Sequence, residues 1–136
     1  MVRISDIEEA LELDSDWVSF YDSAEDAVVS IIEDSDNEES SHLLKKIEDD
    51  SSGRYKPVAK DPHFDNKLMD LFVRGLTDMQ LVETLNGIIH RSNALRNFED
   101  VLKQNGIDKT WAIFRKERYD KEAVEICRAE GIPIDN

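Results

Sequence analysis

The chain has few of the residues that build disulfide frameworks, metal cages and membrane spans. Among its 136 residues there is a single cysteine, Cys127, so neither an internal disulfide nor a cysteine-rich metal cage can form. No apolar run approaches the roughly 20 residues needed to cross a bilayer. The first residues also lack the basic start and apolar block of a signal peptide. We therefore expect a cytoplasmic protein without a membrane segment.

Basic side chains are scarce in the first 50 residues, where only Arg3, Lys45 and Lys46 stand against 17 acidic residues. The net charge of this segment is −14, which equals that of the whole chain, because residues 51–136 contain 14 side chains of each sign. One interpretation is that the excess serves solubility. The other is an acidic surface that meets a basic partner or imitates nucleic acid. Composition alone favours the first.

The proportions of apolar and charged residues, 40% and 35%, are typical of a folded domain with a wet surface. The length fits one domain over residues 1–136. Its first part, residues 1–60, is acidic and contains a helix and a β-hairpin. Its second part, residues 61–136, is helical.

Local patterns predict the elements of the first part. Ser5 and Glu8 have capping-box spacing, which predicts a short helix over about residues 6–13. Residues 17–21 and 27–32 are rich in aromatic and β-branched side chains and read as a β-hairpin. The second arm, AVVSII, is almost entirely apolar, which predicts a central strand covered on both faces.

The segment that follows the hairpin is polar and carries few apolar anchors. Residues 33–50 have a thin helical stripe, and Ser35 with Glu38 could cap its start. Residues 54–58 predict a short strand, which Pro57 places at the edge of a sheet.

From Asp61 onward the periodicity is helical, and it continues through four segments to about residue 130. Phe98 and Trp111 fall on the apolar faces of consecutive helices, so we assign both to the core. The fold class is α+β, with a small antiparallel sheet (the hairpin and an edge strand) packed against a mostly helical carboxyl-terminal half.

Three blocks of sequence are similar to a known family. They are residues 4–12 at the start, residues 28–31 in the hairpin, and residues 94–102 followed by Trp111 and Phe114. Through them the chain resembles the uncharacterised bacterial family UPF0158 over nearly its whole length. The resemblance supports the single domain and the fold, and it brings no assigned activity.

Sequence motifs for catalysis or metal binding are lacking. Asp34, Asp36 and Glu38 have the oxygen spacing of a calcium loop, but the sixth and twelfth positions are Glu39 and Lys45, which excludes an EF-hand. The three histidines, His42, His63 and His90, are scattered, and Cys127 falls on the apolar side of a helix. We expect a non-enzymatic protein without a metal or cofactor.

The leading hypothesis is therefore a protein that binds a macromolecular partner, most simply another protein, through its acidic first third. The candidate binding residues are Asp34, Asp36, Glu38, Glu39 and Trp17. Trp17 is included because an exposed aromatic side chain beside many acids is a plausible anchor for a partner.

The alternative hypothesis is a small anion site for nucleic acid or a phosphorylated ligand. Its candidates are Arg91, Arg96 and Arg115, which lie at adjoining helix ends and on the last helix. Pairing of these arginines with acidic residues of the same chain is the favoured explanation, because the acidic composition disfavours nucleic acid.

Overall fold

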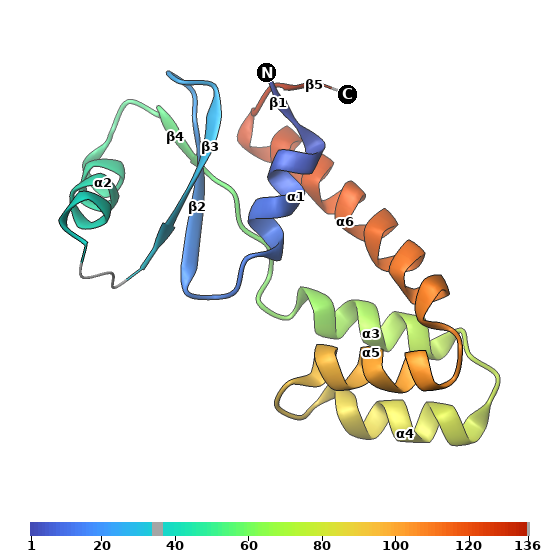
Figure 1. Ribbon diagram of the computed structural model, residues 1–136. Helices are drawn as coiled ribbons and strands as arrows, with labels where there is room; N and C mark the ends of the chain where they lie inside the picture. The colour runs from blue at the N-terminus through green and yellow to red at the C-terminus, as the bar shows by residue number, and fades with distance from the viewer. Residues whose placement is uncertain (34–36, 136) are drawn as a thin grey trace. The chain divides into compact units, whose positions relative to one another are not determined.

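The computed structural model describes residues 1–33 and 37–135 and groups them into two compact units (Figure 1). Unit 1 contains Met1–Lys60 together with Asp120–Asn136, and unit 2 contains Asp61–Tyr119. The sequence predicts residues 120–136 as part of the helical half, whereas the structure groups them with unit 1. The longest helix, α6 (Asp108–Glu130), contributes its first turns to unit 2 and its last turns to unit 1. The α+β class is confirmed.

The sheet of unit 1 has the strand order β3-β2-β4 and is antiparallel throughout. Its strands are β2 (Trp17–Asp22), β3 (Ala27–Ile32) and β4 (Tyr55–Pro57). The hairpin and the edge strand β4 are confirmed, but the central position expected for β3 is wrong. The apolar sequence of β3 reflects cover on its faces by α1 and α2, whereas its place at the edge follows from the pairing of β4 with β2 (Figure 1).

Helix α1 (Ile4–Glu12) packs beside β3 and buries Ile7 and Leu11. It begins earlier than the capping box of Ser5 and Glu8 predicted. The Asp6 carboxylate instead accepts a hydrogen bond of 2.9 Å from the backbone N–H of Arg3. Ahead of the helix, β1 (Val2–Arg3) pairs in parallel with β5 (Ile134–Asp135), a contact that two-residue strands do not reveal in sequence.

Helix α2 (Glu38–Asp49) buries Ile47 and is capped by Asn37, whose side chain accepts from the backbone N–H groups of Glu39 and Ser40. The predicted cap Ser35 lies outside the described residues.

A partly buried ion pair joins the hairpin to Arg54, the residue before β4. Asp22 is 4% exposed, and its two carboxylate oxygens accept from Nε and Nη2 of Arg54 at 2.7 and 2.9 Å. The Arg54 guanidinium, followed by the backbone N–H groups of Ala24 and Glu25, lowers the pKa of the Asp22 carboxyl below its usual range. The backbone N–H of Ser23 also donates to the Arg54 carbonyl. These contacts fix the tight end of the hairpin beside β4.

Unit 2 comprises three helices and the first turns of α6: α3 (Phe64–Arg74), α4 (Met79–Ile89) and α5 (Ala94–Gln104). Phe98 and Trp111 are 0% and 1% exposed, as predicted, with ring centroids 4.9 Å apart. Phe72 and Phe114 complete the aromatic cluster, and the Trp111 indole N–H donates to Glu99 at 2.8 Å. This cluster is the centre of the core of unit 2.

Candidate binding surface of the amino-terminal unit

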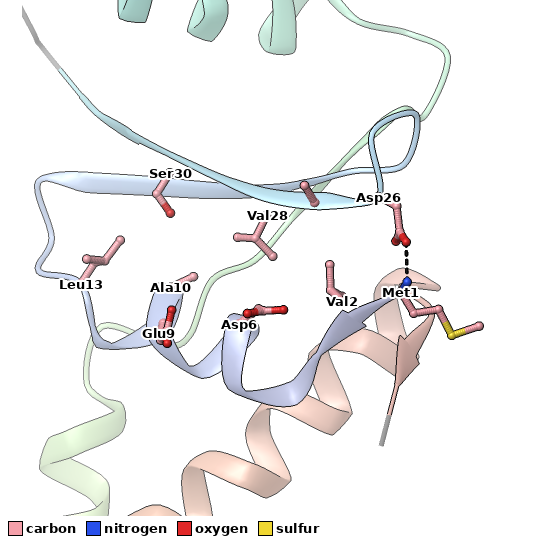
Figure 2. A pocket seen from close by; sticks show the side chains of 10 residues that line it. Met1, Val2, Asp6, Glu9, Ala10, Leu13, Asp26, Val28 and Ser30 are labelled. Carbon is pink, nitrogen blue, oxygen red and sulfur yellow. Dashed lines mark ion pairs between the residues drawn. The ribbon is translucent and has the colours of Figure 1, made fainter.

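A cleft of about 470 Å³ lies between α1 and β3 in unit 1 (Figure 2). Its walls come from α1, from β3 and from the residues beside these elements. The lining residues are Met1, Val2, Asp6, Glu9, Ala10, Leu13, Asp26, Ala27, Val28 and Ser30.

The sequences of α1 and β3 explain why space remains between them. Helical periodicity turns Ile7 and Leu11 into the core and leaves Ala10 at the cleft. Strand alternation places Val28 and Ser30 on the face of β3 that looks toward α1 (Figure 2). Because Ala10 and Ser30 are both small, they cannot fill the gap between helix and strand. The Ser30 hydroxyl lies 2.7 Å from that of Ser19 on β2.

The charged side chains of the cleft are acidic. At one end, Asp26 lies 2.7 Å from the Met1 ammonium (Figure 2). It also accepts a 2.7 Å hydrogen bond from the Tyr21 hydroxyl. These two contacts, the ammonium first, lower the pKa of the Asp26 carboxyl. The same hydrogen bond is the main reason that the pKa of Tyr21 rises to about 12. The charge of Asp26 is thus compensated, which leaves Asp6 and Glu9 as the acidic wall.

An exposed apolar group adjoins the cleft. Leu13, which also lines the cleft, is 37% exposed, and Trp17 and Ile32 are 36% and 43% exposed. Trp17 and Ile32 are directly paired across β2 and β3. Ile32 shares the face of Val28 and Ser30, so the apolar pair continues the cleft along β3. We call the cleft with Leu13, Trp17 and Ile32 the β3 groove.

The acidic candidates that the structure describes, Glu38 and Glu39, do not line the cleft. Glu38 and Glu39 are exposed in the first turn of α2, whereas Asp34 and Asp36 lie outside the described residues. Trp17, a candidate from the sequence, lies in the β3 groove, whereas Asp6 and Glu9 were not among the sequence candidates. Asp6 and Glu9 have the spacing of one helix flank, yet only the pairing of α1 with β3 makes that flank the wall of a cleft.

The arginine candidates belong to unit 2, and one of them is paired within it. Arg115 Nε is 3.2 Å from Asp65, its Nη2 donates to the Tyr119 hydroxyl at 3.0 Å, and its guanidinium lies 4.3 Å from the ring centroid of Tyr119. The Tyr119 hydroxyl in turn donates to Asp65 at 2.8 Å. Arg91 and Arg96 are exposed, and among the described residues neither has an ion pair. The joint anion site remains a prediction.

Metal clusters, membrane-spanning helices and the lone cysteine were the other features that the sequence raised. Within residues 1–33 and 37–135, no group of three or more histidine, cysteine or carboxylate side chains could hold a metal ion. No helix in these ranges is long and apolar enough to cross a membrane. Cys127 is buried, and burial raises the pKa of its thiol.

Comparison with known proteins agrees with the resemblance found in the sequence. Neither the curated proteins nor the solved structures contain a match to this chain. The model of the uncharacterised protein family UPF0158 matches residues 1–134, essentially the whole chain. The chain therefore belongs to the UPF0158 family.

Proposed function

We propose that this protein is a non-enzymatic binding protein that holds a protein partner through the acidic unit 1, with the β3 groove as its contact surface. The observation that carries the proposal is the exposed pair of Trp17 and Ile32, side by side on the sheet. Tryptophan is enriched among the residues that dominate binding energy at protein interfaces. An apolar group of this kind, rimmed by charged residues, is typical of an interaction surface.

The charge around this pair supports a basic partner. Asp14 and Asp16 precede Trp17, Glu33 follows Ile32, and the first 50 residues together carry a net charge of −14. Complementary charge speeds the encounter of two proteins and disfavours partners of like charge. Nucleic acid, which is itself an anion, is disfavoured at this surface for the same reason. We place this activity in the cytoplasm, where a single free thiol is the common state.

A matched pair of variants tests the apolar part of the proposal. Trp17→Ala removes the exposed indole from unit 1, and Ile113→Ala removes a 62% exposed side chain from α6 in unit 2. Affinity capture from a nuclease-treated extract of the native host, read by mass spectrometry, should recover one basic protein with the parent and with Ile113→Ala. Trp17→Ala should lose it. Equal recovery by both variants would contradict the proposal.

A second pair tests the acidic part. One variant combines Asp34→Asn, Asp36→Asn, Glu38→Gln and Glu39→Gln in unit 1. The control makes the same kind of change at exposed acids of unit 2, with Glu83→Gln, Asp100→Asn and Glu117→Gln. We expect capture to fall with the first variant and to persist with the control. Equal capture by both variants would contradict the acidic part of the proposal and would indicate that the acidic excess serves solubility.

A further inference from the structure

The outer edge of β3 carries unpaired backbone groups beside the β3 groove. The backbone carbonyl of Ser19 accepts from the Val58 N–H, and the backbone N–H of Ser23 donates to the Arg54 carbonyl. The backbone groups of odd-numbered residues in and beside β2 therefore point toward β4. Even-numbered residues of β2 therefore bond toward β3, where their partners are Ala27, Val29 and Ile31. The backbone groups of Val28, Ser30 and Ile32 consequently point away from the sheet. Among the described residues, no strand pairs with this edge.

This edge lacks the features that usually protect an exposed strand. Ala27–Ile32 contains no charged residue and no proline. The strand is extended over all six residues. Proteins normally shield such an edge with lysine, proline, a bulge or a covering segment, because a free edge pairs readily with another chain. The side chains of Val28 and Ser30 line the cleft directly next to the free backbone groups. Backbone pairing and side-chain recognition are thus available at one place.

We propose that β3 accepts an extended, basic segment of the protein partner as an additional strand of the sheet. This inference rests on the proposed function and specifies how the β3 groove is used. Backbone hydrogen bonds to Val28, Ser30 and Ile32 supply affinity, as in other cases of strand addition. Alternate side chains of the added strand lie over the cleft, where Asp6 and Glu9 face a lysine or arginine and the Trp17–Ile32 pair faces an apolar residue.

A second copy of this chain is the obvious competing occupant, and charge argues against it. Two copies joined edge to edge through β3 would bring together two segments that each carry a net charge of −14. They would also place the Asp6 and Glu9 walls of both clefts near one interface. Like charges facing each other destabilise paired strands, whereas a basic segment would neutralise them.

Amide hydrogen exchange with a defined peptide tests the proposal directly. The probe is a capped peptide as long as β3, with lysine at the cleft-facing positions beside Asp6 and Glu9, valine at the cleft-facing position beside the Trp17–Ile32 pair, and threonine on the other face. Its control replaces every lysine with glutamate. The lysine peptide should slow exchange at Val28, Ser30 and Ile32 about tenfold or more, because their N–H groups become bonded. Exchange at Val29 and Ile31, which are already bonded to β2, should change little. The glutamate peptide should leave all five amides unaffected.

Two further arms separate strand addition from simple surface binding. Ser30→Pro and Ser30→Ala both remove the hydroxyl contact with Ser19, but only proline removes the outward N–H, and proline is tolerated at an edge position of this kind. We expect Ser30→Ala to bind the lysine peptide like the parent and Ser30→Pro to bind about tenfold more weakly. If Ser30→Pro fails to fold, lysine peptides N-methylated at alternate residues replace it. The peptide methylated only at the N–H groups that point away from β3 should bind, and the peptide methylated at those that point toward β3 should not.

Each contrary result has a defined meaning. Binding of the lysine peptide without protection of the three edge amides, or equal binding of both N-methylated peptides, overturns strand addition while the proposed function stands. Equal binding of the glutamate peptide overturns the selection of a basic segment. Protection of the same amides in the protein alone, with dimers in sedimentation, overturns the proposal in favour of self-association. Loss of partner capture in Trp17→Ala is measured independently, so the two proposals can fail separately.

Discussion

Truncation of Phe98 should destabilise the protein more than almost any other single change in unit 2. Its ring is 0% exposed and lies 4.9 Å from Trp111 and 6.3 Å from Phe72, centroid to centroid. Phe98→Ala removes the transfer free energy of the ring and leaves a cavity that these neighbours cannot fill without moving. Substitutions of this type cost about 3–5 kcal/mol, a large fraction of the roughly 5–15 kcal/mol that stabilises a typical domain. Trp111→Ala should cost a similar amount.

Thermal and urea unfolding measure this effect, and the chain offers a matched control. Ile113→Ala changes an apolar residue on the same helix as Trp111, but Ile113 is 62% exposed, so we expect a change within about 0.5 kcal/mol. The loss for Phe98→Ala corresponds to a fall in Tm of about 10–20 °C. Trp111 fluorescence reports the unfolding of unit 2, and Trp17 fluorescence reports the unfolding of unit 1. Circular dichroism follows the unfolding of the whole chain.

A double substitution refines the same test. If Phe98 and Trp111 contact each other as the structure shows, the combined variant should lose less stability than the two single variants added together. Melts of Phe98→Ala and Trp111→Ala that match the parent, accompanied by loss of a binding activity, would refute the packing argument. The two rings would then belong to a recognition surface.

Three further predictions concern ionisation, the arginines and helix α2. Tyr21 should ionise near pH 12 instead of 10, since Asp26 holds its proton, and Asp26→Asn should bring the ultraviolet titration back toward the lower value. Because the pKa is raised in the folded state, the stability that this contact contributes is fully present below pH 10 and is lost as the pH rises through about 12. Millimolar phosphate or a short oligonucleotide at low ionic strength should shift the side-chain resonances of the predicted anion site if it forms, and an absence of shifts removes that alternative function. The residues to follow are Arg91, Arg96 and Arg115. Helix α2, which buries only Ile47, should exchange its amides faster than the helices of unit 2, and added salt should slow that exchange because at about 0.15 M charges are screened beyond ~8 Å. Exchange slower than in α3 or α5, or unchanged by salt, would contradict this.

The sequence by itself determined those features that depend on short-range pattern. Richness in β-branched and aromatic residues identified β2 and β3, and helical periodicity placed Phe98 and Trp111 in the core before any contact was known. These predictions succeed because a strand or helix repeats its burial every two or about 3.6 residues. The family resemblance rests on the same local blocks, and it is confirmed over residues 1–134.

Only the tertiary structure decided which elements meet. The place of β3 at the edge depends on β4, which lies far along the chain and pairs with β2. Arg115 forms an ion pair with Asp65, 50 positions away in the sequence. Its guanidinium, which the sequence offered as part of an anion site, is therefore paired within the chain. The β3 groove exists because small residues of α1 and β3, Ala10 and Ser30, come to face one another. Local propensity carries no information about such pairings, since they are set by the packing of whole elements.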